Sequence, residues 1–467
     1  MNEGNFTNVI FEEIEIGVPV TVERPVTQPE VEAMALVSGD VDPYHLEPGR
    51  REAEKEIASA QAVGAEAILS GLLNRRMPGP GTRILEQNLR FRGTIRTGEP
   101  VTAMVTAKSK NRSGNLVVFD CLVKQGASEL IAGTVTVEAP TRRIAYESIA
   151  TPEIILRRKD AIARLLKRCE GLEPVTCAIV HPCDKASLLG PLEAARRGLI
   201  VPVLVGPEAK IRAVADAEKV DLPYRIVSTE HSHAAAETAV AMARSGEIEA
   251  LMKGSLHTDE LMGAVVSSAT GLRTARRISH AFIMDIPAYP RTVTVTDAAV
   301  NIFPDLATKV DIVQNAIDLA QVLGVETPKV AILAAVETVN PKMQATLDAA
   351  ALCKMADRGQ ITGGILDGPL AFDNAISEEA AKTKKIVTPV AGHADILLVP
   401  DLEAGNMLAK QLQYLAGADS AGIVLGARVP IVLTSRADNV RSRLASVAVM
   451  ALVAHAKRAK QPTWQTR

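Results

Sequence analysis

The spacing of apolar residues changes near residue 140, and this change constrains the fold more than any other feature of the sequence. Before it, long runs such as RILEQNLRF at residues 83–91 alternate apolar and polar side chains, which is typical of strands with one buried face. After it, short apolar runs alternate with stretches of helical spacing, which is typical of parallel strands joined by helices. The 467 residues exceed one ordinary core. We therefore expect a domain at 1–140, a linker at 141–152 and a second domain at 153–467.

The N-terminal part predicts an α+β domain in which a curved antiparallel sheet wraps around one long helix. The Ala-rich stretch at about 56–75 is the candidate for that helix. A shorter helix is expected to begin after Thr27, because Thr27 and Glu30 have the spacing of a capping box. The expected strands lie at residues 83–91, 100–107, 115–123 and 130–137.

The C-terminal part predicts an α/β domain with a mostly parallel sheet, divided into two lobes with a cleft between them. The expected helices include residues 184–197, 234–244, 307–322 and a long one ending near 457. The expected strands are residues 175–180, 201–205, 224–227, 249–252, 281–285, 329–333, 364–366, 396–399, 422–425 and 431–433.

Charge and composition exclude several classes of function. Lys and Arg total 52 against 54 Asp and Glu, so there is no overall basic field to attract nucleic acid or anionic lipid. Aromatic residues are only 3%, too few for a surface that stacks bases. No apolar run approaches the roughly 20 residues of a membrane span.

Cellular location is predicted from the N-terminus and the cysteines. The first residues are acidic and lack the basic and apolar regions of a secretory signal. The five cysteines are scattered without a CxxC pair, which indicates reduced thiols. We therefore expect a cytoplasmic protein.

The string SGDVDPYH at residues 38–45 is the first candidate site. Asp40 and His45 lie five residues apart in a turn, where a carboxylate and an imidazole can act as acid and base on one water molecule. The alternative is that Asp40 caps the turn and His45 is an ordinary, half-exposed histidine.

Residues 10–138 resemble the MaoC-like (R)-specific enoyl-CoA hydratase family. The matching stretches are residues 38–45, 70–73, 77–82, 89–91 and 97–99. The resemblance implies a hot-dog fold and hydration of a trans-2-enoyl-CoA, with Asp40 and His45 activating the water. It also implies that the N–H of Gly64, at a helix N-terminus, polarises the thioester carbonyl. Two positions differ from the family, since Asp42 replaces the usual Asn and Val63 the usual His.

The second candidate site is the run PIVLTSRADN at residues 430–439, where a buried strand is expected to end and a helix to begin. Ser435 and Asp438 have the spacing of a capping box, which is the purely structural interpretation. The junction of a strand and a helix N-terminus also binds anions, and Arg436 would add a phosphate donor.

The C-terminal part resembles the phosphate acetyl/butyryltransferase family along almost its whole length. The matching stretches are residues 251–258, 296–304, 367–370, 399–406 and 434–438. The surroundings of Asp373 and the ending SRAD look closer to the butyryl branch.

The resemblance implies acyl transfer between CoA and inorganic phosphate, which are substrates, with no permanently bound cofactor and no metal. Asp438 would be the base near the thiol, Ser435 would donate to the transition state and Arg436 would hold the phosphate. Lys253 and Arg273 are candidates for a second cationic group. Arg291 is a further one.

Two smaller patterns have a structural and a functional interpretation. Residues 230–233 (EHSH) favour the start of a helix, because no third metal ligand is visible beside the two histidines. Cys183 follows an expected strand end and favours a buried thiol over a reactive one.

Together these patterns predict a bifunctional acyl-CoA enzyme that forms a homo-oligomer, a dimer or higher, and binds neither nucleic acid nor membranes. In the leading alternative, the hot-dog domain only binds acyl-CoA or assembles the oligomer. In a second, the C-terminal half has a regulatory role. A third is an isocitrate-dehydrogenase-like fold, which would require a nicotinamide cofactor and a metal.

Overall fold

The computed structural model describes residues 6–39, 59–60, 63–93, 95–146, 161–433 and 440–460. The chain divides into two units, residues 1–157 and 158–467. None of the helices in these described ranges is long and apolar enough to cross a membrane.

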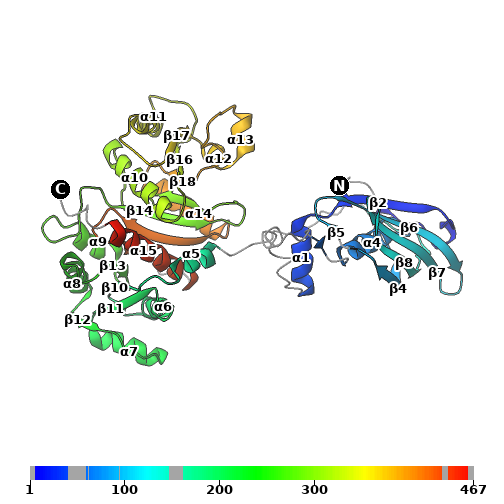
Figure 1. The fold of residues 1–467 in the computed structure, drawn as a ribbon, viewed down its shortest axis with the longest axis horizontal. Helices are drawn as coiled ribbons and strands as arrows, with labels where there is room; N and C mark the ends of the chain where they lie inside the picture. The colour runs from blue at the N-terminus through cyan, green and yellow to red at the C-terminus, as the bar shows by residue number, and fades with distance from the viewer. Residues whose placement is uncertain are drawn as a thin grey trace. The chain divides into compact units, whose positions relative to one another are not determined.

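The N-terminal unit packs helix α4 (Val63–Arg75) against a five-stranded antiparallel sheet (Figure 1). The strand order is β2-β6-β7-β8-β4. The four predicted strands and this helix-on-sheet layout are confirmed. The strands of the sheet are β2 (Pro19–Pro25), β4 (Arg83–Phe91), β6 (Pro100–Asn111), β7 (Leu116–Gln125) and β8 (Ser128–Glu138).

Alternate side chains of the strands, together with side chains of α4, form the core of this unit. Every second side chain is buried along β7 and along β6 from Val101 to Ala107, and Phe119 and Val123 of β7 are fully buried. Leu69 and Leu73 lie four residues apart on α4 and belong to the same cluster of buried side chains. The helix thus supplies the apolar face that the concave side of the sheet requires.

Three features of this unit differ from the sequence-based expectation. The long helix begins at Val63 rather than near residue 56, because Ser59–Ala60 form strand β3 paired with β5 (Ile95–Arg96). Strand β2 was not predicted; proline stands at both of its ends, which suits an edge strand. In the range proposed as a linker, β9 (Ala145–Tyr146) pairs with β1 (Phe6–Thr7).

Helix α1 (Gln28–Ser38) begins as predicted with the Thr27 capping box, in which the Glu30 carboxylate accepts from the Thr27 backbone N–H at 2.8 Å. Gly39 ends the helix in the left-handed conformation. The first candidate site, residues 38–45, therefore spans the end of this helix. Its residues Asp40 and His45 lie outside the described residues.

The C-terminal unit is built on one 11-stranded sheet with the order β12-β11-β10-β13-β20-β19-β14-β15-β18-β16-β17. Its strands are β10 (Val175–Val180), β11 (Ile200–Gly206), β12 (Ile226–Ser228), β13 (Ala250–Lys253), β14 (Ser279–Asp285), β15 (Val293–Thr296), β16 (Lys329–Leu333), β17 (Ile365–Leu370), β18 (Ile396–Leu398), β19 (Asp419–Leu425) and β20 (Ile431–Val432).

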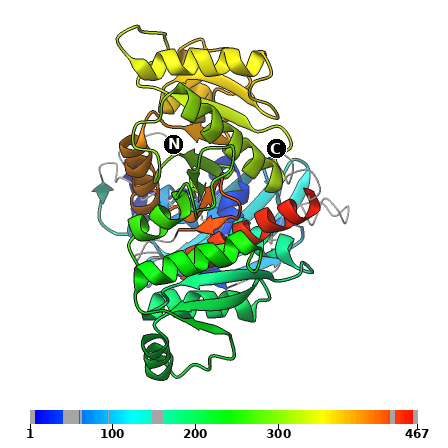
Figure 2. The same cartoon turned by 90° about the vertical axis from the view of Figure 1, so that its left-hand side faces the viewer.

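Helices flank this sheet, and α7 and α11 lie at opposite ends of the unit (Figure 2). The helices are α5 (Ala161–Cys169), α6 (Lys185–Arg196), α7 (Glu208–Glu218), α8 (Ser232–Ser245), α9 (Thr258–Val266), α10 (Leu306–Val322), α11 (Gln344–Asp357), α12 (Phe372–Ile376), α13 (Glu378–Thr383), α14 (Leu402–Tyr414) and α15 (Val440–Lys460).

The sheet is mostly parallel, as predicted, but its direction changes in the middle. Strands β12, β11, β10, β13 and β20 are mutually parallel, and so are β15, β18, β16 and β17. Antiparallel pairings of β19 and β14 connect these two halves. The two expected lobes thus share one continuous sheet. Strand β15, with the sequence VTVT, was not predicted.

Candidate active site

The carboxyl ends of β10, β13 and β20 meet at one edge of the large sheet. Val180 pairs in register with Lys253, and Met252 pairs with Val432. His181, Gly254 and Leu433 therefore follow one another along this edge. The segment 434–439 follows Leu433 in the chain, and its residues Ser435, Arg436 and Asp438 lie outside the described residues.

Backbone pairing is lost beside this edge. Strands β19 and β20 pair only at Val424 and Ile431. Two residues before Val424 in β19, the Gly422 backbone N–H donates to Ser446 Oγ of α15 at 3.0 Å instead of to β20. The sheet also reverses its strand direction between β20 and β19.

Lys253 ends β13 at this edge and is only 5% exposed. Its ammonium donates to the Gly254 carbonyl oxygen at 3.4 Å. A buried ammonium is retained in proteins where anionic or hydrogen-bonding groups surround it. Lys253 therefore has the position expected of a second cationic group.

Arg273 does not join Lys253. The Arg428 N–H donates to the Leu272 carbonyl oxygen, and Leu251 N–H to Pro430 O. Residue 272 therefore lies near the amino ends of β13 and β20, at the opposite edge of the sheet. Arg273 itself is exposed there.

Arg291 is held within the other half of the sheet. It donates to the His393 carbonyl oxygen at 3.0 Å and lies 3.5 Å from the Asp395 carboxylate. Of the three cationic candidates, the structure brings only Lys253 next to the start of the 434–439 segment.

Sequence reasoning missed a cluster around His181 and Ser255. Ser255 Oγ donates to the His181 carbonyl oxygen at 2.9 Å, lies 3.2 Å from His181 Nδ1 and accepts from the Cys183 N–H at 3.2 Å. His181 has a φ of 57°, in the left-handed region. Each residue had a signal in the sequence, because His181 follows an expected strand and Ser255 belongs to a stretch that matches the transferase family. Nothing in the sequence indicates that the two residues are in contact.

Gly254 lets the loop after β10 cross the end of β13. A Cβ at this position would lie 2.4 Å from the Val180 carbonyl oxygen and 2.6 Å from the His181 carbonyl oxygen. Both atoms belong to the backbone, so the loop itself would have to shift. The close approach of His181 to Ser255 therefore depends on glycine at position 254.

The environment of this loop shifts the pKa values of two titratable groups. Burial lowers the pKa of His181, and the charge of Lys210 adds to this, while Ser255, Glu260 and Asp184 counter it. Burial raises the pKa of the Cys183 thiol to about 11. At neutral pH the imidazole is therefore neutral and Cys183 is a protonated thiol, which favours the structural interpretation of this cysteine.

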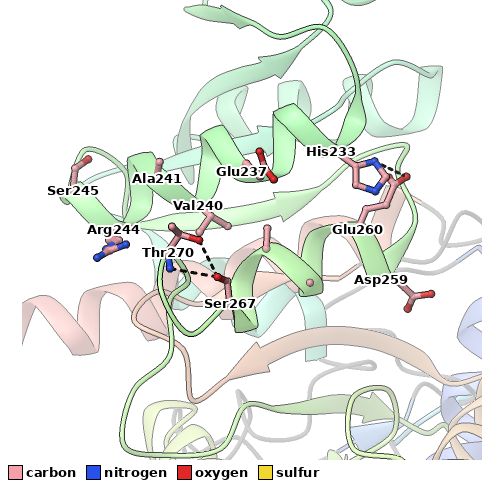
Figure 3. A pocket seen from close by; sticks show the side chains of 12 residues that line it. His233, Glu237, Val240, Ala241, Arg244, Ser245, Asp259, Glu260, Ser267 and Thr270 are labelled. Atoms are coloured by element: carbon pink, nitrogen blue, oxygen red, sulfur yellow. Dashed lines mark hydrogen bonds and ion pairs between the residues drawn. The ribbon is translucent and has the colours of Figure 1, made fainter.

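A groove of about 1080 Å³ lies between α8 and α9 (Figure 3). At one end His233 Nδ1 lies 3.5 Å from Glu260 Oε1, and at the other Arg244 donates to the Ala269 carbonyl oxygen. His231 is the N-cap of α8 and accepts from Ala234 N–H, so the EHSH run marks a helix start, as predicted. Within the described ranges, no group of three or more His, Cys, Asp or Glu side chains could hold a metal ion.

In the N-terminal unit, the structure describes one of the proposed hydratase residues. Gly64 is the second residue of α4, so its N–H is among the first four of the helix, which have no acceptor within it. A Cβ at Gly64 would lie 3.5 Å from Met34 Sδ of α1. Helix α1, which leads into Asp40, therefore packs beside the N-terminus of α4.

The comparisons with known proteins identify the C-terminal part. A family model described as phosphate acetyl/butaryl transferase matches residues 224–451. A protein of Rhizobium meliloti named phosphate acetyltransferase is 64% identical over 299 residues, which cover 64% of this chain and 95% of the relative. The chain belongs to the phosphate acetyl/butaryl transferase family. A phosphate butyryltransferase of Clostridium acetobutylicum is 39% identical over 62% of this chain and 97% of that one.

One solved structure agrees with the family assignment. A branched-chain phosphotransacylase from Enterococcus faecalis is 32% identical, with a TM-score of 0.54 over 60% of this chain and 99% of that chain. An (R)-hydratase from Pseudomonas aeruginosa covers 33% of this chain and 99% of its own, with 23% identity and a TM-score of 0.31.

Proposed function

We propose that the C-terminal unit transfers an acetyl group between CoA and inorganic phosphate. The observation that carries this proposal is the edge where Lys253, at the end of β13, adjoins the start of the segment with Ser435 and Arg436. Family membership supports it, and the higher identity to an acetyltransferase than to a butyryltransferase, 64% against 39%, favours the acetyl group over the butyryl group.

The proposed residues have distinct roles in phosphorolysis. An oxygen of HPO4²⁻ attacks the thioester carbonyl carbon, the carbon–sulfur bond breaks, and the phosphate proton is transferred to the CoA sulfur. Arg436 and Lys253 balance the charge of the phosphate, and Ser435 donates a hydrogen bond to the developing oxyanion. In the reverse direction, Asp438 acts as the base near the CoA thiol. The reaction yields acyl phosphate and free CoA.

The test of this function uses the full chain with acetyl-CoA and phosphate, with acetyl phosphate and free thiol measured together. We expect phosphorolysis in the wild type and a loss of about 100-fold or more in Arg436→Gln, the scale seen when a transition-state donor is removed. Arg225→Gln is the control, because Arg225 pairs with Glu247 on the surface of the same unit. Absence of activity with both acetyl-CoA and butyryl-CoA would contradict the proposal.

We also propose that the N-terminal unit hydrates trans-2-enoyl-CoA. The carrying observation is that α1, which leads into Asp40, contacts α4 at Gly64, where a helix N-terminal N–H can polarise a carbonyl. Asp40 and His45 would deliver the elements of water to the double bond. The alternative is a module that binds acyl-CoA or assembles the oligomer without turnover.

Crotonyl-CoA without phosphate distinguishes these two functions of the N-terminal unit. We expect a product heavier by one water molecule in mass spectra, and its absence in His45→Ala. If neither crotonyl-CoA nor longer enoyl-CoA substrates gain water while acyl-CoA still binds, the unit is a binding module.

We propose that the chain forms a homo-oligomer through the edge strand β4. Within the described sheet, β4 pairs with β8 on one side only. Leu85 and Phe91 on this strand are 46% and 53% exposed. An open edge with exposed apolar side chains favours pairing with a second copy. Light scattering tests this: Leu85→Lys with Phe91→Lys is expected to lower the mass, and an unchanged mass would contradict the interface.

A further inference from the structure

We propose that the exposed face of α14 is an interface for a second copy of this chain, with the two copies related by a two-fold axis that passes close to Met407. Helix α14 packs against β14 and β15 in the C-terminal unit (Figure 1). This surface belongs to a different unit from the β4 edge, so it is a second, separate contact between copies. The inference does not depend on the activity of either unit.

Helix α14 has one buried face and one exposed face. Gly405 and Ala409 are buried, and Leu408 and Leu412 pack against the same cluster of buried side chains. The exposed residues recur at helical spacing on the opposite side and are Glu403, Met407, Lys410, Gln411 and Tyr414. A helix face in contact with water is usually polar throughout, but Met407 and Tyr414 are each more than half exposed.

Further exposed apolar side chains lie at both ends of the helix. At its N-terminus, the Leu402 N–H donates to the Ile302 carbonyl oxygen at 3.0 Å, and Ile302 and Phe303 are 63% and 77% exposed. At its C-terminus, Leu415 follows Tyr414 and is 84% exposed. The two ends of α14 are about 20 Å apart, at 1.5 Å per residue. Apolar side chains gathered on one surface in this way mark an interaction site.

Hydrogen bonds and close packing hold this surface in place. The Asp297 carboxylate accepts from the Asn301 side chain at 2.6 Å, which ties the turn that leads into Ile302. Asn406 of α14 donates to the Ala298 carbonyl oxygen at 3.2 Å. A Cβ at Gly405 would lie 2.7 Å from the Asp297 carbonyl oxygen, so glycine allows the helix to approach this turn. A surface that is fixed before binding loses little conformational freedom when it docks.

The charges on the exposed face match a second copy of the same face. Glu403 lies about 6 Å before Met407 along the helix axis, and Lys410 lies about 4.5 Å after it. Neither Glu403 nor Lys410 forms an ion pair with another residue in the described part of the chain. In an antiparallel pair of helices centred on Met407, Glu403 of each copy therefore faces Lys410 and Gln411 of the other. Opposite charges thus meet on both sides of the axis.

The same symmetry brings the apolar ends together. Tyr414 lies about 10.5 Å after Met407, so it faces a point about 10.5 Å before Met407 on the other copy. That point is just beyond the N-terminus of α14, which the loop with Ile302 and Phe303 borders. Tyr414 and Leu415 of one copy can therefore cover Ile302 and Phe303 of the other. An unrelated partner would not require a surface that complements itself, so this pattern favours a second copy.

A charge exchange tests the symmetry of the interface. The full chain is studied by analytical ultracentrifugation with Leu85→Lys and Phe91→Lys present, so that the β4 edge does not contribute. Glu403→Lys places like charges opposite each other and should raise the dissociation constant about 10-fold or more. Adding Lys410→Glu exchanges both charges in both copies and should restore association. A double variant that associates no better than Glu403→Lys would overturn the proposal.

Removal of the apolar contacts should separate the copies. In the same background, Met407→Lys with Tyr414→Lys should halve the mass measured by light scattering, with little change in Tm because both side chains are exposed. Val201→Lys is the control, because Val201 is exposed on β11, five strands from β14 in the sheet. An unchanged mass in the Met407 and Tyr414 variant, or a wild type that is monomeric at every concentration, would overturn the proposal.

A disulfide across the axis tests the position of Met407 directly. Two cysteines can form a disulfide only when their Cα atoms lie within about 7 Å of each other. Met407→Cys should therefore give a covalent dimer on a non-reducing gel after oxidation with diamide. Val201→Cys is the control, and the five native cysteines are buried or half-buried. Equal cross-linking of the two variants would place the axis elsewhere and contradict the proposed interface.

Discussion

Val180 and Lys253 face each other on neighbouring parallel strands, and the residues that follow them form the core of the candidate active site. His181 turns across the end of β13, and Gly254 leaves room for it. The register of these strands therefore places His181 and Lys253 at neighbouring strand ends, next to Leu433, after which the segment that the family resemblance assigns to phosphate binding follows in the chain.

Gly254→Ala should disturb this arrangement. The added Cβ would meet two backbone carbonyl oxygens at 2.4 and 2.6 Å, so the loop of His181 must shift. We expect a loss of stability of about 1–3 kcal/mol and at least a 10-fold fall in transferase activity, measured by urea unfolding and by phosphorolysis. Gly263→Ala on α9 is the control, because a Cβ there has no neighbour within 4 Å and alanine favours the helix. Equal effects of the two substitutions would contradict the close-approach argument.

Gly64→Pro tests whether the backbone N–H of Gly64 polarises the thioester. Proline removes the N–H and adds a ring, and the first turn of a helix tolerates it. We expect hydration of crotonyl-CoA to fall by about 100-fold with a small change in Tm. Gly64→Ala keeps the N–H, and its Cβ would make ordinary contacts at 3.5 Å, so it should retain activity. Retained hydration in the proline variant would exclude this N–H as the donor.

Glu249 connects the start of β13 to α15, and its charge should make stability depend on pH. Its carboxylate accepts from Arg458 Nε at 2.5 Å and from a second guanidinium nitrogen at 2.6 Å, and also bonds Thr176. The Arg458 hydrogen bonds lower the pKa of Glu249 from 4.5 to about 2. The stabilisation is therefore fully present above pH 4.5 and is lost as the pH falls from there toward 2.

Glu249→Gln should accordingly destabilise the unit by about 1–2 kcal/mol at pH 7, a value reduced for partial solvent screening. The difference from wild type should close as the pH falls below 4.5, as followed by thermal unfolding. Glu247→Gln is the control, since its partner Arg225 is more exposed, and it should cost less than about 0.5 kcal/mol. A difference that does not change with pH would rule out the charge as its cause.

Lys309 and Asp348 form a buried ion pair between α10 and α11, with a distance of 2.6 Å and side chains 6% and 7% exposed. Gln344 also donates to Asp348 at 2.7 Å. Asp348→Ala leaves a buried ammonium without its carboxylate, so we expect a loss of about 3–5 kcal/mol in urea unfolding. Replacing both residues, Lys309→Met with Asp348→Leu, should cost less than the single change. A double variant that is less stable than Asp348→Ala would contradict this account.

Periodicity predicted most of the fold, because the signals were local. The alternation in residues 83–91 gave β4 with its observed bounds, and the spacing of Thr27 and Glu30 gave the start of α1. The strands that periodicity did not predict depend on the strands that pair with them. Ser59–Ala60 form a strand only because β5 is beside them, and the four-residue strand β15 pairs on one side with the preceding strand β14 and on the other with the distant strand β18.

Prediction of the candidate site from the sequence has the same limit. The motif around Lys253 was recognised from the sequence, but Arg273, only 20 positions later in the chain, lies at the opposite edge of the sheet. Conversely, His181 and Ser255 are separated by 74 residues, and only the register of β10 and β13 joins them. Motif spacing cannot report such neighbours, because parallel strands bring together residues from separate βα units.

The central claim is that one chain carries two independent acyl-CoA reactions, and a single measurement tests it directly. The full chain is incubated with crotonyl-CoA, acetyl-CoA and phosphate, and hydrated product and acetyl phosphate are quantified together by mass spectrometry. The account predicts that His45→Ala abolishes water addition and keeps acetyl phosphate formation, whereas Arg436→Gln does the reverse. Loss of both products in either variant, or absence of either product in the wild type, would contradict it.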